Sequence, residues 1–300
     1  IIKNEDLAVH GNRSIGAIVD AVHHTRPRRL PAGWYPAGES QTRKQIEAFL
    51  RTAGIAGQTA CAGVAPHAGW EFSGRLACRV LACLDPETQT VAVVGGHLSP
   101  GDGVLAAFED GYETPLGAVQ ADLELLACLR ERIRVAEDRW QDNTVEVQLP
   151  LLRYLAPGAR ALALRAAPSG EALALGEALA ACAGELGRRL AVVGSTDLTH
   201  YGPNYGFVPH GLGPAALAWV REHNDRRLVD ALLALEHERV LELARRERSA
   251  CSAGGAVAAA RFAQLRGSVR GSLLEYATSH DLYPGSSFVG YAAISFPVGA

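Results

Sequence analysis

The sequence predicts a single-domain αβα sandwich built around a largely parallel central sheet. Short apolar runs alternate along the chain with longer segments of helical periodicity, which is typical of βαβ units. The 300 residues are 48% hydrophobic and 20% charged, values of an ordinary globular protein with enough apolar material for a large core. No internal repeat or linker-like composition interrupts residues 32–300, and we therefore predict one α/β domain over residues 30–300.

The first 29 residues are predicted to form an N-terminal extension outside this domain. They lack clear periodicity beyond residues 15–22, which have the length of two helical turns, and Pro27 and Pro31 close the segment. The basic cluster at 23–29 is short and is best explained as a flexible, solvated segment.

The elements of the domain follow from local apolar patterns, caps and breakers. Ser40 is expected to cap the first helix, and Asp122 stands in the same place before a later one. Pro150 falls inside a short helical segment, and a long helical region breaks near Asn224. The expected helices are 40–51, 73–83, 122–132, 145–154, 171–186, 215–246 and 255–265. The expected strands are 59–65, 90–94, 104–108, 160–166, 190–193, 273–278 and 288–296.

Composition and charge exclude several classes of partner. A formal net charge of −3 gives no electrostatic reason to expect nucleic acid or an acidic membrane. No apolar run approaches the ~20 residues that cross a bilayer, and the first residues lack a signal-peptide pattern. The six cysteines are scattered without CxxC spacing, so we expect neither a disulfide framework nor a zinc ribbon. A cytoplasmic, reduced protein without nucleic-acid or membrane partners is the expectation.

Histidines follow two of the predicted buried strands. His67 lies in APHAGW (65–70), where a proline restrains the backbone before it and small residues leave room beside it for a ligand. A histidine in this position is expected to be presented rather than buried. His97 follows the next strand after two glycines. Each histidine alone is as simply explained by a turn, but loops at strand ends are where α/β scaffolds hold their chemistry.

The stretch AVVGSTDLTHYG (191–202) supplies a third strand end. Asp197 and His200 lie directly after the strand, in a segment too polar to continue it. Three strand ends that each offer an imidazole indicate a metal site, because imidazole suits Zn, Cu, Fe and Ni. No glycine-rich phosphate loop competes for the site, since Gly194 begins a GST sequence that lacks the P-loop lysine.

One cysteine differs from the others in its surroundings. Cys251 comes just before the predicted helix 255–265, where unpaired N–H groups favour a thiolate, and it is therefore a candidate ligand or nucleophile. The remaining five lie within apolar strands or helices and are expected to be small core residues. They are Cys61, Cys78, Cys83, Cys128 and Cys182.

Two acidic residues are further candidates. Glu146 lies at the start of a helix and is either a hydrogen-bond acceptor behind a ligand histidine or simply a helix-start carboxylate. Asp281 follows a strand, but residues 281–287 have the composition of a surface turn.

The strand ends, the helix start and the cysteine described above, taken in their order along the chain, resemble the Memo-like family, and the resemblance covers residues 30–296. The family is similar in fold to class III extradiol dioxygenases, the non-haem iron enzymes that open catechol rings. The matching segments are AGWYP (32–36), APHAGWEFSG (65–74), the strand ending in Gly-Gly-His (93–97), ETPLG (113–117), NTVEVQLPLL (143–152), GSTDLTHYG (194–202), Cys251 before its helix, and YATSHD…SSFVGYAAISF (276–296).

The resemblance implies a metal-binding cleft whose ligands are two histidines and a cysteine. On this sequence the ligand positions fall on His67, His97 and Cys251, with Asp197 and His200 beside them. These are the residues that the strand ends and the helix start had already singled out.

This chain departs from the family pattern at three places. Gly-Gly-His-Leu (95–98) stands where the family usually has Pro-Ser-His-His, so a second imidazole is missing. Ser252 replaces a common glycine after the cysteine, and Asn143 replaces a common histidine. The first change removes a proton donor or substrate contact, so metal binding is better supported than catalysis.

These residues leave three functions open. The first is a redox enzyme with a mononuclear Fe(II) or Cu ion (Zn is possible), in which His200 is the acid/base and Asp197 orients it for a small or aromatic substrate. The alternative is a non-catalytic module that captures metal or peptide in the same cleft. A third is a thiol or amide hydrolase with Cys251 as nucleophile and His200 as base.

Overall fold

The computed structural model describes residues 24–53, 59–140 and 142–298. Within these residues nine strands form a central mixed sheet: β2 Ala60–Ala65, β3 Thr90–Gly95, β4 Val104–Ala106, β7 Val135–Glu137, β8 Arg160–Ala166, β9 Leu190–Ser195, β10 His200–Tyr201, β11 Ser272–Thr278 and β12 Phe288–Pro297. The strand order is β10-β12-β2-β9-β3-β8-β4-β7, and β11 pairs with β12.

The centre of the sheet is parallel and its flanks are mixed. Strands β2, β9, β3 and β8 run parallel to one another. β12 pairs antiparallel with β2, and β4 pairs antiparallel with β8. The four central strands are almost entirely buried, as expected for parallel strands covered on both faces. The predicted parallel sheet is therefore confirmed at its centre, while antiparallel pairs extend it on both sides.

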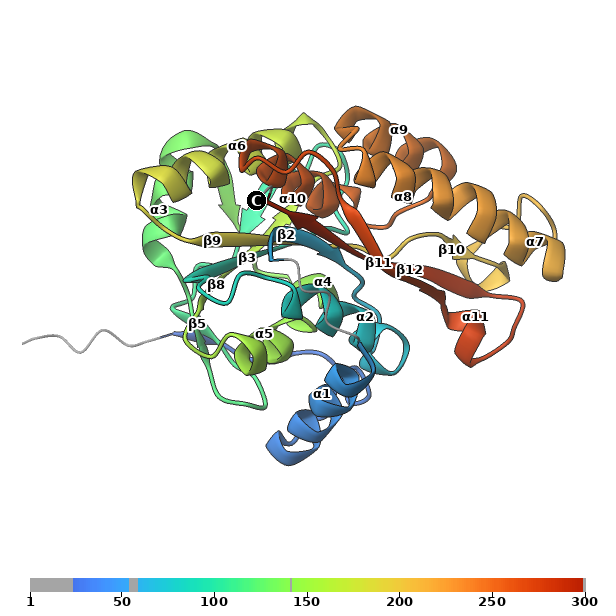
Figure 1. Cartoon of the computed structure of the whole chain (residues 1–300), viewed down its shortest axis with the longest axis horizontal. Helices are drawn as coiled ribbons and strands as arrows, with labels where there is room; N and C mark the ends of the chain where they lie inside the picture. Colours follow the sequence, from blue (N-terminus) through green and yellow to red (C-terminus); the bar gives the residue numbers. More distant parts are fainter. Residues whose placement is uncertain (1–23, 54–58, 141, 299–300) are drawn as a thin grey trace, which may run out of the picture.

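Helices cover both faces of the sheet, which confirms the αβα sandwich (Figure 1). One face packs against α1 Glu39–Ala53, α2 Trp70–Ala82, α4 Asn143–Glu146 and α5 Leu149–Leu155. The other packs against α3 Leu123–Arg132, α6 Gly170–Glu185, α8 Asp225–Leu233, α9 His237–Glu247 and α10 Ala253–Leu265. Two short helices, α7 Pro214–Trp219 and α11 Ser279–Leu282, lie beside β10 and β12. In the described part of the chain, no helix combines the length and apolar character needed to cross a membrane.

Most predicted helices form, with differences at their ends. Asp122 caps α3 as predicted, because its side chain accepts the Leu125 N–H. Ser40 lies inside α1, which already begins at Glu39. The predicted helix 145–154 splits into α4 and α5, since Pro150 is tolerated in the first turn of a new helix but not in a helix interior.

Short or polar elements escaped prediction. The strands β1 Thr25–Arg26, β5 Gly111–Tyr112 and β6 Val119–Gln120 form a small second sheet, in which each strand has two residues. The region 215–246 contains a π-helical turn, Val220–Asn224, between α7 and α8. The helix α11 overlaps the start of the turn expected at 281–287, and a capping box between Thr278 and Asp281 caps its N-terminus.

The basic segment before the domain is docked on it, although most of its residues remain exposed. β1 pairs with β5, and the Arg26 guanidinium donates to the backbone carbonyls of Asp138 and Trp140 at 2.9 Å each. The prediction of a flexible segment is therefore wrong for residues 24–29, because carbonyl and carboxylate acceptors hold its donors, while the predicted exposure to solvent is found at most of these residues. The domain boundary at residue 29 stays a prediction, and residues 15–22 lie outside the described part of the chain.

Glu146 anchors the segment that follows. Its carboxylate accepts the backbone N–H groups of Arg29 and Leu30 and the Tyr35 hydroxyl, at 2.8–3.1 Å. Glu146 lies in the first turn of α4, as predicted for a helix-start carboxylate, but that role does not account for these contacts. The carboxylate instead fixes the chain on both sides of Ala32–Trp34, which lines the cleft described below.

Two cysteines expected to be unpaired are joined. Cys128 on α3 and Cys182 on α6 form a disulfide with Cα atoms 5.9 Å apart. The sequence expectation of no disulfide is wrong here, because a separation of 54 residues carries no spacing signal and only the packing of two helices brings the thiols together. Cys78 and Cys83 are buried free thiols and Cys61 is half-buried, as expected of core residues.

Candidate metal centre

Three neighbouring strands deliver the predicted site residues to one edge of the sheet. β2, β9 and β3 are adjacent and parallel, so their carboxyl ends lie side by side. His67 follows the end of β2, Asp197 follows β9 and His97 follows β3, each by two residues. Parallel pairing therefore brings together residues that are 30 to 130 positions apart in sequence.

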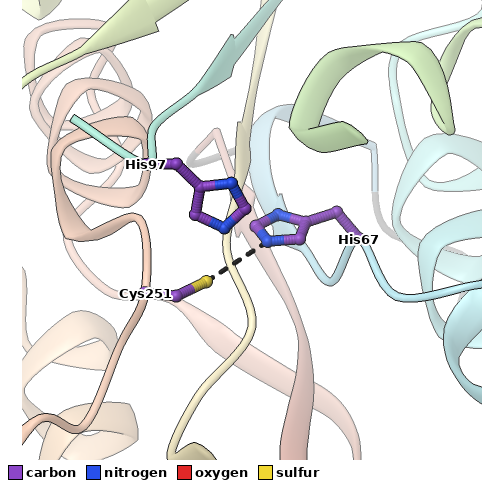
Figure 2. A group of neighbouring side chains, drawn as sticks. All are labelled: His67, His97 and Cys251. Atoms are coloured by element: carbon purple, nitrogen blue, oxygen red, sulfur yellow. Dashed lines mark hydrogen bonds between the residues drawn. The ribbon is translucent and has the colours of Figure 1, made fainter. Parts of the chain in front are cut away.

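His67, His97 and Cys251 face one another, as Figure 2 shows. One potential ligand atom from each residue lies within 4.8 Å of the other two. The Cys251 Sγ is 3.2 Å from His67 Nε2, and the two imidazole rings are nearly perpendicular with centroids 5.0 Å apart. Within the described residues, no other group of three or more His, Cys, Asp or Glu side chains has such an arrangement.

Close packing of α10 on the sheet places Cys251. The Cys251 N–H donates to the Asp197 carbonyl at 3.2 Å, and Ser252 is the N-cap residue of α10. Gly255 allows the helix to approach, because a Cβ there would lie 2.1 Å from the Val94 carbonyl oxygen of β3. The cysteine therefore precedes a helix N-terminus, as predicted, and that N-terminus abuts the strand that carries His97.

His97 is fixed by contacts on both its backbone and its ring. Its Nδ1 lies 3.0 Å from an Asp142 carboxylate oxygen, and its N–H donates to the Ser252 hydroxyl at 3.2 Å. The backbone φ of His97 is +58°, a left-handed conformation that costs free energy for a residue other than glycine. Arg165, itself buried, pairs with Asp142 at 3.5 Å. Sequence reasoning missed Asp142, because its only local signal is that of a helix cap.

His67 is buried, with 1% of its surface exposed, although the sequence predicted a presented side chain. Its backbone N–H donates to the Asp197 carboxylate at 2.8 Å, and its carbonyl accepts from the Asn143 side chain at 2.9 Å. The Nδ1 atom lies 3.2 Å from the Ser195 hydroxyl, which leaves Nε2 facing Cys251. The contact of Ser195 with Nδ1 thus fixes the orientation of the His67 ring, as hydrogen bonds to the second ring nitrogen do for ligand histidines of metal proteins.

The electrostatics of the cluster favour a thiolate. Burial opposes charge on Cys251, but the adjacent imidazoles of His67 and His97 hold the pKa of the thiol well below its ordinary value. Burial lowers the pKa of His97, while the Asp142 hydrogen bond and the Cys251 sulfur outweigh it and bring this pKa to about 10. Burial raises and the His97 and Thr144 hydrogen bonds lower the pKa of Asp142, which falls to about 2. A metal ion bound at this place would therefore compete with a proton on His97.

An open cleft of about 630 Å³ lies against these residues. His67, His97, Asp197 and His200 all line it. The His200 ring is partly exposed and packs edge-to-face on Tyr205, with centroids 5.0 Å apart. Among the described contacts, Asp197 hydrogen-bonds to the His67 backbone and not to His200, which it was expected to orient. The volume is typical of a small-molecule site.

The donor set fits a single metal ion. Catalytic sites commonly use three protein ligands and leave one position open to a substrate. His67, His97 and Cys251 supply two imidazoles and a thiolate, and the first two also line the cleft. Imidazole and thiolate together suit Cu, Zn and Fe.

Fold and site together define a single-domain α/β protein with a candidate two-histidine, one-cysteine metal centre at the carboxyl end of its parallel strands. The sequence pattern of Memo-like proteins matches residues 26–295, and the chain belongs to this family. The resemblance drawn from the sequence motifs is thereby confirmed.

The relatives share the full length of the domain. A MEMO1 family protein of Thermococcus onnurineus is 30% identical over 282 residues, which is 88% of this chain and 97% of that protein. One from Methanopyrus kandleri is 31% identical over 290 residues, covering 88% and 95% of the two chains. The crystal structure of an uncharacterized Escherichia coli K12 protein shares the fold, with a TM-score of 0.50 and 15% identity over 79% of this chain and 99% of that one.

Proposed function

We propose that this protein is a metal-dependent redox enzyme of the dioxygenase type. In this proposal one Fe(II) or Cu ion is held by His67, His97 and Cys251, and the substrate is a small aromatic molecule bound in the cleft. The observation that carries the proposal is the convergence of three ligand atoms within 4.8 Å beside an open cavity of substrate size. When bound, such an ion supplies redox and Lewis-acid chemistry.

The surrounding residues hold the ligands and move protons. Asp142 and Ser195 contact the Nδ1 atoms of His97 and His67, which leaves the Nε2 atoms for the centre. His200 stands in the cleft, partly exposed, where its imidazole can take a proton from a bound phenol and return it later. Asp197 acts as a positioning residue through the His67 backbone.

The test is oxygen consumption by protein reconstituted anaerobically with Fe(II) or Cu and supplied with catechols. We expect uptake by the native chain, and a fall of about 100-fold in His200→Ala with metal content unchanged. His24→Ala, an exposed histidine outside the cleft, is the matched control. Metal-loaded native protein that consumes no oxygen with any catechol would contradict the proposal and favour the alternative of a non-catalytic metal- or peptide-binding module.

The hydrolase alternative paired Cys251 with His200. The Cys251 Sγ lies instead 3.2 Å from the His67 Nε2 atom. Alkylation of Cys251 by iodoacetamide distinguishes a metal ligand from a hydrolase nucleophile. Protection of the thiol by bound metal supports the ligand role, whereas labelling that is the same with and without metal supports the nucleophile.

A further inference from the structure

Part of the cleft wall is aromatic, and its basic side chains are histidines. Rings of Trp34, Phe72, Tyr205 and Tyr291 line it. Among the described residues that line the cleft there is no lysine and no arginine, and the one acidic residue is Asp197. A ligand bound here meets aromatic faces, which attract cations, and the side chains of the lining that can pair with an anion are the imidazoles of His67, His97 and His200.

A carboxylate stands at the rim of the cleft. The rings of Phe72 and Tyr283 meet edge-to-face with centroids 5.8 Å apart, and they are 37% and 56% exposed, so they mark the outer end. The Tyr283 hydroxyl donates to the carboxylate of Glu71, the residue before Phe72. The buried His67 marks the inner end, where the metal ligands lie.

Nearby arginines are engaged elsewhere. Arg221 pairs with Asp281, and Arg75 pairs with Glu275. Arg248 lines an adjoining hollow that shares His200 and Tyr205 with the cleft. Its guanidinium donates to the backbone carbonyls of Tyr205 and Gly206 and stacks on the Phe207 ring, so these contacts already occupy it.

We propose that the cleft selects aromatic ligands whose outer end is uncharged or cationic, such as a primary amine, and rejects those that carry a carboxylate or phosphate there. Phe72 and Tyr283 provide the ring faces for this end, and Glu71 provides the negative charge. The inference rests on the proposed function for its inner end, since the phenolic oxygens lie toward the metal ligands. Glu71 is thus assigned as a specificity-determining residue.

Three ligands with one ring and different tails test this selection. Binding of 4-ethylcatechol, 4-(2-aminoethyl)catechol and 4-(2-carboxyethyl)catechol is measured by calorimetry, with Zn(II)-loaded and with metal-free protein. Zn(II) has no redox chemistry, so no ligand is consumed. We expect the carboxylate to bind at least about tenfold more weakly than the ethyl compound, and the amine to bind at least as tightly.

Glu71→Gln is the decisive variant, and Glu87→Gln, at the amino ends of the strands, is its matched control. The amine-to-carboxylate ratio of affinities is expected to fall several-fold in Glu71→Gln and to stay unchanged in Glu87→Gln. A carboxylate that binds as tightly as the amine, an unchanged ratio in Glu71→Gln, or no binding of any of the three ligands overturns the inference. Metal content measured on the same samples reports separately on the proposed metal centre, because the ratio is also obtained without metal.

Discussion

At the scale of single residues, the unexpected feature is the support behind His97. Asp142 joins the His97 ring to the buried Arg165, so one carboxylate both orients a candidate ligand and balances a buried cation. Carboxylates in this position raise ligand basicity and fix ring orientation in metal sites.

Replacing Asp142 by Asn is expected to weaken metal binding by about 10- to 100-fold, because the His97 ring loses its charged acceptor. Competition with a chelator measures the affinity. Asp142→Glu should recover part of the loss. Asp85→Asn, in a turn at the amino ends of β2 and β3, should have no effect. Equal affinities in Asp142→Asn and the native chain would show that the contact has no part in metal binding.

The residues of the candidate site were predictable from the sequence, but the other residues that hydrogen-bond to them and to the cleft wall were not. His67, His97 and Asp197 each follow an apolar strand, a local pattern that the sequence displays. The contact of Asp142 with His97 spans 45 residues and depends on where α4 packs. Glu146 likewise had a visible helix-start position, but its partners Arg29 and Tyr35 are more than 100 residues away. Contacts of this kind depend on packing and leave no periodic signal.

At the scale of elements, α10 determines where Cys251 lies. Its first turn packs directly on the strands, since a Cβ at Gly254 would lie 2.2 Å from the Ala166 carbonyl oxygen and one at Gly255 2.1 Å from that of Val94. Backbone oxygens on strands cannot move aside as flexible side chains do. The glycines are therefore required for the close approach that brings the cysteine to the histidines.

Gly255→Ala is expected to destabilise the fold by about 1–3 kcal/mol and to lower metal content, because α10 must shift away from β3. Gly184→Ala on α6 is the control, since nothing lies within 4 Å of its added Cβ and alanine favours a helix, so its stability should stay equal or rise slightly. Urea unfolding of both variants measures the change. A Gly255→Ala protein as stable as the native chain would show that α10 has room to adjust.

Long amphipathic or apolar elements were well predicted, and short ones were not. The strands β2, β3, β8 and β9 are six or seven residues long and mostly apolar, and each appears where expected. The two-residue strands β1, β5 and β6 have no periodicity to detect, and pairing with one another creates them. The sheet order was not predictable either, because the antiparallel pairing of β12 with β2 joins residues as distant in sequence as Ile294 and Val64.

At the scale of the whole molecule, a buried carboxylate ties the C-terminal half together. Asp225, fully buried on α8, accepts the Thr199 N–H at 3.0 Å and the Tyr276 hydroxyl at 2.7 Å. It therefore links α8 to the segment before His200 and to β11. Burial raises the pKa of Asp225 to about 6, although the hydrogen bonds from Thr199 and Tyr276 oppose the shift.

A raised carboxyl pKa in the folded state makes the stability depend on pH. Below the unfolded value of 3.8 both states are protonated, so Asp225 contributes its full stabilisation, which is lost as the pH rises through about 6. Between pH 5 and 7 the native chain should lose on the order of 1 kcal/mol relative to Asp225→Asn. Urea unfolding across this range measures the difference, with exposed Asp230→Asn as control. Parallel pH profiles for the native chain and Asp225→Asn would contradict the assignment.

Elemental analysis of protein purified without oxygen shows whether His67, His97 and Cys251 hold one metal ion. The account predicts about one Fe or Cu per chain in the native protein and in Cys61→Ala, a half-buried thiol remote from the cluster. In Cys251→Ala, whose folding is checked by circular dichroism, metal content should fall at least about tenfold. Equal metal content in Cys251→Ala and the native chain, or a native chain that takes up no metal, would contradict the account.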